Sequence, residues 1–401
     1  MYKYVLLFLS TILLQACITS SSNTNRNNRQ ANAEDTKLKT YSMGMPSKFK
    51  IINEAEHRYL LVESPIENYK LTIKLFKDYT DAVPVWEGTN LTLYPCPFAE
   101  NYRYLALSQL ATLGETPWVV WVKLENTATN TSIIDMLTVN PLQDNAQNLF
   151  LVNENGTLLH IDKYVKKGST YRFMRPGKTV NNYTVHYYPK ALPIALPAHS
   201  SQNNVFAPLK TERTTSVLSK DDLYTFEQTG TYLIQTDLEP NQGILITCVE
   251  ADFPKITKVS QMVEAMRYLT KNEEYEALMN GSNQKLELDN FWMKMAKGNV
   301  ENAKILLRSY FKRVEFANYY FTAEKEGWRT DRGIVYIVFG TPTLIKKTAK
   351  SENWYYRLYN GSTLYFNFTK IGEIYALNRE SNYGPIWNDY IRMWRNGEIR
   401  E

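Results

Sequence analysis

The sequence predicts a mainly β-stranded protein with an α+β C-terminal part: tandem Ig-like β-sandwich domains, a helical segment, and a small antiparallel sheet domain. Three observations support this fold class. Short strand-like runs follow one another over 49–249, apolar residues adopt helical spacing over 254–326, and period-2 alternation returns over 354–368.

In the front half, polar and apolar residues alternate over 70–75 and again over 183–187, which is the pattern of half-buried strands. Residues 118–122 are continuously apolar and follow Pro117, so we expect a central strand there. The sequence Thr229-Gly230-Thr231-Tyr232 is typical of a tyrosine corner, in which the phenol binds nearby backbone at the start of a strand.

After the second sandwich, residues 262–269 carry one apolar helical face and residues 291–295 indicate another helix. A third helix is predicted from Asn299, a suitable N-cap, to about Glu326, where Gly327 ends it as the C′ residue. Its apolar stripe has 3.6-residue spacing and consists of Ile305, Leu306, Tyr310, Val314, Ala317, Tyr320 and Phe321.

The tail is predicted to return to β-structure. Residues 334–339 are apolar throughout and are expected to form a buried strand. Asn360-Gly361 separates two alternating runs, 354–359 and 363–368, which predicts a hairpin with a type I′ turn. Residues 374–377 should add a further strand.

The N-terminus resembles a bacterial lipoprotein signal. A basic start at Lys3 precedes an apolar stretch over 5–14, which is too short for the roughly 20 residues that span a bilayer. Leu14-Gln15-Ala16-Cys17 then places a small residue before a cysteine. We expect a mature chain that begins at Cys17, acylated on its thiol and amine with palmitate-type chains. The alternative is an ordinary signal peptide with a chance cysteine.

Residues 18–40 are rich in Ser, Asn and Thr and cannot form a core, so they read as a flexible tether. No acidic cluster directly follows Cys17. In Bacteroidota-type lipoproteins, which this start resembles, early acids accompany export to the cell surface. We therefore expect lipid anchoring in the outer membrane, on the periplasmic face.

The expected organisation places a signal peptide at 1–16, the tether at 17–40, β-sandwiches at 41–150 and 151–252, the helical segment at 253–326 and an α+β domain at 327–401. Two further cysteines, Cys96 and Cys248, would fall in different domains. An oxidising envelope permits a disulfide between them, whereas the strand-like setting of Cys248 favours a buried thiol. The sequence leaves this open.

The most distinctive internal segment is Gly327-Trp328-Arg329-Thr330-Asp331-Arg332-Gly333, followed by an apolar run and Gly340-Thr341-Pro342. It resembles the GWxTD domain family, found largely in envelope proteins of Bacteroidota and related bacteria. The resemblance is specific over about 290–380. It implies an envelope protein and no particular activity.

We predict that these motif residues form a structural corner. Gly327 would end the helix, and Trp328 would be a large anchor between helix and sheet. Thr330 and Asp331 have short side chains suited to holding backbone amides, and Gly333 would let the chain enter the strand.

The alternative is a hydrolase in which Asp331 acts as general acid or base, with Glu324 or Glu326 as its partner. Catalytic carboxylates need a positioned mate and a tuned pKa. No spacing in the sequence specifies such a mate.

We expect neither a metal nor a cofactor. His160, His186 and His199 are separated by 26 and 13 residues, which matches no metal-ligand motif. The net charge of +5 over 401 residues is too mild to imply nucleic acid as a partner.

One basic stretch, 163–210, contains no Asp or Glu. It is either a solvated basic sheet edge or a surface for anions or an acidic protein partner, with tyrosines interleaved at positions 171, 183, 187 and 188. The candidate surface residues are Lys163, Lys166, Lys167, Arg172, Arg175 and Lys178.

Taken as a sequence, the chain is expected to be a non-catalytic envelope lipoprotein that acts as a protein-interaction or assembly component of an outer-membrane or periplasmic machine. Its partners would be the membrane, through the lipid, and envelope proteins. A second hypothesis is a module that binds envelope polysaccharide through Trp354, Tyr355, Tyr359 and Tyr365.

Overall fold

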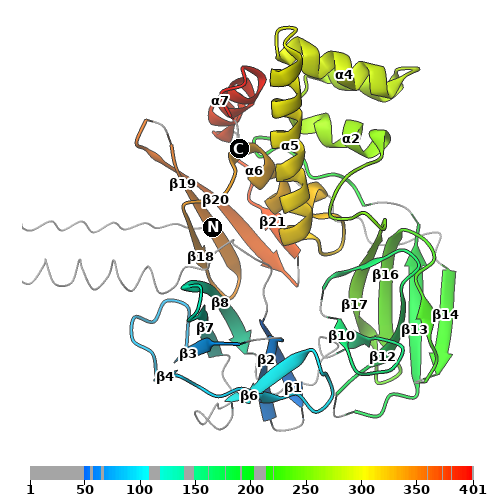
Figure 1. The fold of residues 1–401 in the computed structure, drawn as a ribbon, viewed down its shortest axis with the longest axis vertical. Coiled ribbons are helices and arrows are strands. Elements are labelled where there is room, and N and C mark those ends of the chain that lie inside the picture. The colour runs from blue at the N-terminus through cyan, green and yellow to red at the C-terminus, as the bar shows by residue number, and fades with distance from the viewer. Residues whose placement is uncertain are drawn as a thin grey trace, which may run out of the picture. The chain divides into compact units, whose positions relative to one another are not determined.

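The computed structural model describes residues 49–54, 57–64, 67–107, 118–139, 149–160, 162–176, 178–189, 192–202, 214–219, 221–358, 360–372, 374–380 and 382–399. Cys17, the predicted signal peptide and the predicted tether lie outside these residues. All elements below belong to one compact unit, residues 39–401. The predicted fold class, β-rich with an α+β C-terminal part, is confirmed (Figure 1).

The first β-region is built from two four-stranded antiparallel sheets, ordered β1-β2-β6-β5 and β4-β3-β7-β8. The predicted central strand is β7, which lies between β3 and β8. Apolar side chains of both sheets, such as Leu60 and Ile73, pack in one cluster, as in a β-sandwich. The strands are β1 Phe49–Glu54, β2 His57–Glu63, β3 Tyr69–Phe76, β4 Trp86–Thr89, β5 Tyr94–Pro95, β6 Tyr102–Ala106, β7 Trp118–Asn126 and β8 Thr131–Val139.

The second β-region has sheets ordered β10-β9-β12-β15 and β11-β17-β16-β13-β14, with β11 and β17 parallel. The Tyr232 hydroxyl donates to the Gln228 carbonyl at 2.8 Å, which confirms the tyrosine corner. The strands are β9 Phe150–Val152, β10 Leu159–His160, β11 Tyr164–Lys166, β12 Thr170–Met174, β13 Asn182–Tyr188, β14 Thr214–Ser219, β15 Tyr224–Thr225, β16 Gly230–Thr236 and β17 Glu239–Val249.

The two remaining cysteines lie in separate hydrophobic clusters. Cys96 is buried in a cluster with Ile52 and Phe150, and Cys248 is buried with Phe226 and Ile246. The two thiols are not joined in a disulfide. Of the two alternatives that the sequence left open, the structure therefore has buried thiols.

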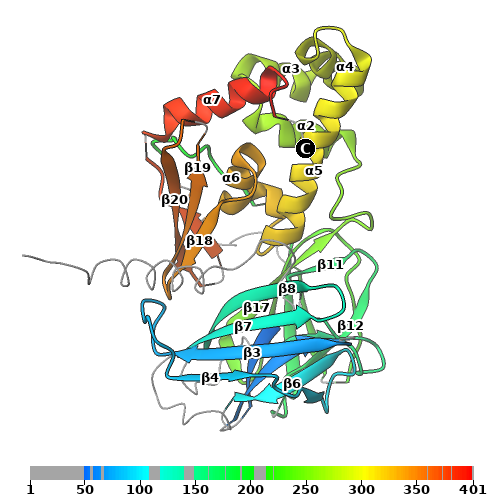
Figure 2. The same cartoon turned by 60° about the vertical axis from the view of Figure 1, so that its left-hand side comes forward.

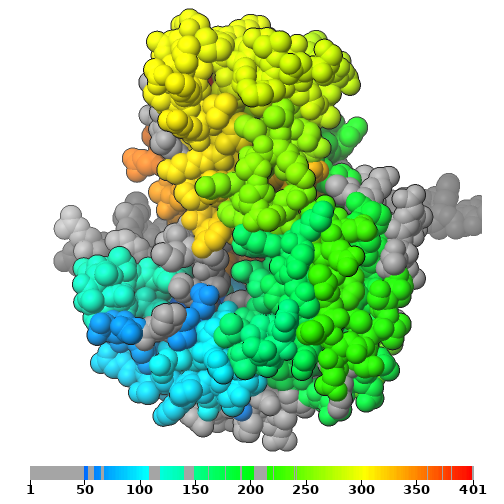
Figure 3. Space-filling model, turned by 45° about the vertical axis from the view of Figure 1, so that its right-hand side comes forward, coloured from blue at the N-terminus to red at the C-terminus, as the bar shows by residue number. Residues whose placement is uncertain are grey.

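The helical segment contains the predicted helices, and the space-filling view shows their joint surface in yellow-green and yellow (Figure 3). Asn299 caps the longest helix as predicted, since its side chain accepts from the Asn302 amide at 2.9 Å. The helices are α2 Val259–Ala265, η3 Met266–Tyr268, α3 Asn272–Asn280, α4 Gln284–Met295, α5 Val300–Phe321, η4 Gly327–Arg329, α6 Asp331–Phe339 and α7 Tyr383–Arg395.

The predicted end of the longest helix was wrong. α5 stops at Phe321 rather than near Glu326, because Thr322 turns to an extended conformation. The Thr322 hydroxyl donates to the Asn318 carbonyl at 2.6 Å and accepts from the Gly327 amide at 2.9 Å. These bonds occupy a carbonyl at the helix end and fold the next residues back along α5. Gly327 therefore opens η4 and does not act as the C′ residue of α5.

The strand predicted over 334–339 was also wrong, because these residues belong to helix α6. α6 is surrounded on every side: all residues from Gly333 to Phe339 are buried. A fully buried helix has no polar face, so its apolar run cannot be told from a buried strand by periodicity. Figure 2 shows α6 lying between α5 and the C-terminal sheet.

The C-terminal sheet is an antiparallel meander, ordered β18-β19-β20-β21. On its inner face, Trp354 packs against Phe321 of α5 and Phe366 against Phe339 of α6, with ring centroids 5.3 and 5.0 Å apart. The strands are β18 Leu344–Lys347, β19 Ser351–Arg357, β20 Thr363–Ile371 and β21 Ile374–Leu377.

The hairpin predicted at Asn360-Gly361 exists, but its turn differs. The Leu358 amide donates to the Ser362 carbonyl at 2.9 Å, so the loop is longer than two residues. Gly361 has positive φ, at +82°. A type I′ turn belongs to a two-residue loop, so that turn type is corrected.

Candidate functional site

Two glycines let backbone segments of the motif approach each other closely. A Cβ on Gly327 would lie 1.9 Å from the carbonyl oxygen of Ala317 in α5. A Cβ on Gly333 would lie 1.9 Å from the carbonyl oxygen of Gly327. Gly333 was expected to ease entry into a strand, whereas it lies in the first turn of α6 and permits contact with η4. Neither glycine has positive φ, so close packing explains both.

Trp328 is the buried centre of the motif, with 0% of its surface exposed. Its backbone amide donates to Asn318 Oδ1 at 3.1 Å, and its indole Nε1 donates to Glu326 Oε2 at 2.9 Å. The Arg329 guanidinium lies over its ring, 4.6 Å from the centroid. The indole is therefore packed, hydrogen-bonded and stacked on one side by a cation.

Thr330 joins η4 to α6 as the N-cap of α6. Its hydroxyl accepts from the Gly333 amide at 3.1 Å and donates to the Gly327 carbonyl at 2.7 Å. Thr330 followed by an acid in the first helical turn is a helix-start signal. That signal, read ahead of the apolar run, would have identified α6 from sequence.

Asp331 is bound by donors from the end of β21 and from Arg379, two residues beyond that strand. Its Oδ1 lies 2.6 Å from Arg379 Nη2, and its Oδ2 accepts from the Leu377 amide at 2.7 Å and from Arg379 Nη1 at 3.3 Å. Both charged side chains are only 2% exposed. Asp331 thus ties the first turn of α6 to the end of β21.

Arg379 extends this connection to a segment that leaves the second sandwich after β13. We call residues 193–199 the strap. Arg379 donates to the carbonyls of Leu196 and Pro197 at 2.8 and 3.2 Å. The Ala195 amide donates to the Arg329 carbonyl at 2.9 Å, so the strap contacts the motif directly.

Sequence reasoning missed both Arg379 and the strap. Arg379 is 48 residues from Asp331, and no local pattern marks that pairing. A signal did exist for the strap: residues 189–198 are mostly apolar and contain three prolines, which cannot supply ladder amides. We therefore expect such a run to pack against the core without joining a sheet. In the structure, Ala195 and Ala198 belong to the hydrophobic core of the C-terminal part.

The carboxylates offered as acid–base partners for Asp331 have other contacts. Glu326 accepts from the Trp328 indole and from Arg329 Nε. Glu324 is buried, and burial raises the pKa of its carboxyl. Since both oxygens of Asp331 accept from fixed donors, the geometry suits Asp331 to holding backbone rather than to exchanging protons with a substrate.

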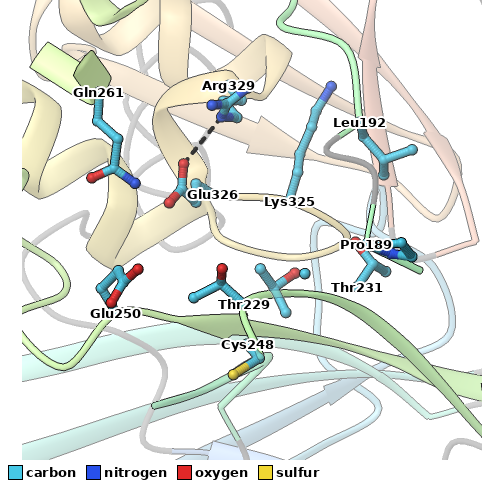
Figure 4. Close-up of a pocket in the computed structure, with 12 residues that line it drawn as sticks. Pro189, Leu192, Thr229, Thr231, Cys248, Glu250, Gln261, Lys325, Glu326 and Arg329 are labelled. Carbon is cyan, nitrogen blue, oxygen red and sulfur yellow. Dashed lines mark hydrogen bonds and ion pairs between the residues drawn. The ribbon is translucent and has the colours of Figure 1, made fainter. Parts of the chain in front are cut away.

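A small cavity of about 150 Å³ lies beside the motif, between Lys325, Arg329 and the strands β16 and β17 (Figure 4). Lys325 Nζ donates to the Pro193 carbonyl at 2.8 Å, and Arg329 pairs with Glu326 and with Glu264. Burial raises the pKa of the Cys248 thiol to about 12, which keeps it protonated. The two cations described around this cavity therefore already have partners, a backbone carbonyl for Lys325 and two carboxylates for Arg329.

The basic stretch is only partly a surface. Lys166, Lys167 and Lys178 are exposed, and Lys163 and Arg172 are half-buried. Arg175 is only 3% exposed, which corrects its assignment to a surface. Two of the interleaved tyrosines, at positions 183 and 188, are core residues and cannot supply contact area.

The histidines have separate partners. His186 lies between Thr215 and Gln235, at 2.9 and 2.8 Å, and His160 Nε2 lies 2.7 Å from the Tyr164 carbonyl. Among the residues that the structure describes, no group of three His, Cys, Asp or Glu side chains could hold a metal ion. Within the same residues, no helix is long and apolar enough to span a membrane.

The fold and the site together describe a β-rich protein whose helical C-terminal part is held by a buried tryptophan and a buried Asp–Arg pair. Residues 230–396 match the family model described as the GWxTD domain, so the chain carries a GWxTD domain, as the motif predicted. The match begins at β16, and Thr231 and Thr247 of β16 and β17 donate to the carbonyls of Glu324 and Ala323.

No curated protein matches the chain. Among solved structures, it is similar to the C-terminal 282-residue fragment of intimin, solved in complex with the intimin-binding domain of the translocated intimin receptor. That alignment has 10% identity, covers 84% of this chain and 95% of the other, and has a TM-score of 0.14. A similarity at this level supports no inference.

Proposed function

We propose that this chain is a non-catalytic lipoprotein of the bacterial envelope, anchored in the outer membrane through acylated Cys17. Facing the periplasm, it acts as an assembly component that holds a protein partner. The GWxTD domain is the rigid body of this component, and the β-regions space it from the lipid.

The buried pair of Asp331 and Arg379 carries this proposal. The one acid of the motif is used to join α6, β21 and the strap, and both of its oxygens accept from protein donors. A motif used in this way builds a stable platform. Large apolar side chains are also exposed on α3, α4 and α5, as expected of a contact surface: Met279, Leu286, Val300 and Ile305 are 38–52% exposed.

Site-specific photocrosslinking in cells tests the proposal. A photoreactive phenylalanine analogue at Leu286 or Ile305 should yield one discrete adduct, identified by mass spectrometry. The same analogue at Val217 in β14, which is 67% exposed, is the matched control and should not yield that adduct. Absence of any discrete adduct from α4 and α5, in a protein of normal abundance, would count against a partner on this face.

A second candidate function is binding of envelope polysaccharide. Tyr355 and Tyr365 lie on the outer face of the C-terminal sheet, 6.0 Å apart with an interplanar angle of 32°, and Tyr365 is 51% exposed. Asn353 and Asn367 on the same face are joined by a hydrogen bond. Such an aromatic pair beside amides suits a sugar ring.

Two other residues of that hypothesis do not contribute. Trp354 has 0% exposure and is a core residue, which corrects its assignment as a contact, and Tyr359 lies outside the described residues. This candidate would be favoured if the protein were retained on purified envelope glycan and if Tyr355→Ala, but not Tyr275→Ala, abolished that retention. Equal retention of both variants would argue against it.

A further inference from the structure

A second and larger cavity, of about 560 Å³, shares no lining residue with the small one. Three segments line it: the strap end at Pro197 and His199, the turn from η3 into α3 over 267–272, and the outer turns of α7 over 387–396. Its volume lies within the roughly 300–1,000 Å³ range of small-molecule sites. None of the motif residues Gly327 to Gly333 lines this cavity, and neither does any of the six candidate surface cations of the basic stretch.

The cavity is lined by cations, and within the described residues no Asp or Glu is among its lining side chains. Arg395 is neutralised by Glu274, with which it makes two contacts of 2.7 and 2.8 Å. Arg392 is only loosely compensated, 3.6 Å from Asp389 and 3.8 Å from Glu398.

Two further cations are available to a ligand. Arg267 and Lys271 are both exposed, and neither has an ion-pair partner in the described part of the chain. The Arg267 guanidinium lies over the Tyr275 ring at 4.8 Å, which holds it at the rim. The acid nearest to Lys271 in sequence is the exposed Glu273 in the first turn of α3, and the acid nearest to Arg267 is Glu264, which pairs with Arg329. Burial lowers the pKa of His199, so its ring adds no positive charge near pH 7.

The floor of the cavity is apolar. Tyr268, Leu269 and Trp387 are between 1% and 4% exposed, and Ile391 is half-buried beside them. The cavity thus offers cationic donors at its rim and carbon surface beneath. Arg and Lys at one rim complement a doubly charged phosphate, because their hydrogen bonds to it are charge-assisted.

We propose that this cavity binds a phosphate ester, with the phosphate at Arg267, Lys271 and Arg392 and the organic part against Trp387 and Leu269. A soluble phosphate monoester presents such a doubly charged phosphate, and the headgroup of a glycerophospholipid presents a singly charged phosphodiester that the same cations can bind. This proposal does not depend on the assembly role proposed above, so the failure of one would not affect the other.

Calorimetric titration of the full mature protein with glycerol 3-phosphate tests the site, with glycerol as the neutral control. The double variant Arg267→Gln/Lys271→Gln should weaken binding at least tenfold. The matched variant Arg308→Gln/Lys350→Gln removes the same charges from exposed positions outside the cavity and should bind as the wild type. Asn388→Trp fills the cavity without changing charge and should also abolish binding.

Vesicles distinguish the two sources of phosphate ester. The ligand would be a lipid headgroup if the protein bound phosphatidylglycerol vesicles but not phosphatidylcholine vesicles and if Asn388→Trp abolished that binding. Binding of glycerol 3-phosphate without such vesicle binding would assign a soluble ester. The proposal would be overturned if glycerol bound as tightly as glycerol 3-phosphate or if neither phosphate probe bound. It would also be overturned if both double variants weakened binding equally or if Asn388→Trp bound as the wild type.

Discussion

The Asp331 carboxylate and the Arg379 guanidinium form a buried ion pair, with 2.6 Å between Oδ1 and Nη2 and 2% of each side chain exposed. The pair joins two positions 48 residues apart. Through the carbonyls of Leu196 and Pro197, Arg379 also fixes the strap. The most conspicuous acid of the motif is therefore a connection between three chain segments.

Asp331→Asn should destabilise the protein by about 3–5 kcal/mol, because it leaves the buried Arg379 charge without its counter-charge. The asparagine keeps an acceptor for the Leu377 amide, so folding should survive. Chemical denaturation of the mature protein measures the loss. Arg379→Met combined with Asp331→Asn should cost less than the sum of the single variants, and strict additivity would show that the two groups are not coupled.

The same Asp331→Asn variant separates the structural role from an acid–base role. At a temperature where it remains folded, it should complement a deletion strain at least partly. Complete loss of function in a variant that is folded, lipidated and normally abundant would bring the hydrolase hypothesis forward.

Trp328→Ala should cost about 3–5 kcal/mol, the usual range for removing a fully buried large aromatic side chain. Tyr365→Ala is the comparison, since Tyr365 is 51% exposed and its loss should change stability by only about 0.5 kcal/mol. Both are measured as free energies of unfolding. Equal, small effects would mean that Trp328 is not an anchor.

Gly327→Ala should destabilise the protein by at least about 1–3 kcal/mol, because its Cβ would lie 1.9 Å from a backbone oxygen and α5 would have to move. Gly384→Ala in α7 is the matched control. There the nearest atom to the new Cβ is 3.7 Å away, so the alanine fits without a steric clash. Melting temperatures should fall for the first variant and change little for the second.

Cys17→Ser should release the protein from the membrane fraction, because the proposed anchor is the acyl group on that cysteine. Membrane fractionation after a high-salt wash measures this, with Ser20→Ala as the control that keeps the lipidation site. A Cys17→Ser protein that stays in the membrane pellet would point to another anchor or a tightly bound partner.

In the basic stretch, Lys166→Glu/Lys167→Glu should leave stability nearly unchanged, since exposed charges contribute little. Arg175→Glu should instead destabilise the fold markedly, because that position is 3% exposed. If the lysines form an acceptor surface, membrane or partner association should weaken in the double variant and fall with salt in the wild type. If association is the same at all salt concentrations and in both proteins, the stretch is a solvated basic sheet edge and not an acceptor surface.

The features predicted correctly from sequence are those decided by neighbouring residues. Period-2 alternation identified β3 and β13, an asparagine identified the start of α5, and Thr229 to Tyr232 identified the tyrosine corner. In each case, the signal and the structure lie within one strand or one helical turn. The motif likewise identified the family, because its residues are contiguous.

By itself, the sequence thus determined the strands, the helix start and the GWxTD domain, since these depend on local periodicity and capping. The tertiary structure alone decided that α5 ends at Phe321, that Arg175 is buried and that Asp331 binds Arg379. It also decided between strand and helix at 334–339, where the apolar run and the Thr330 cap favour different elements. The physical reason is that burial on all sides erases the periodicity of an apolar run and that ion pairs join residues distant in the chain.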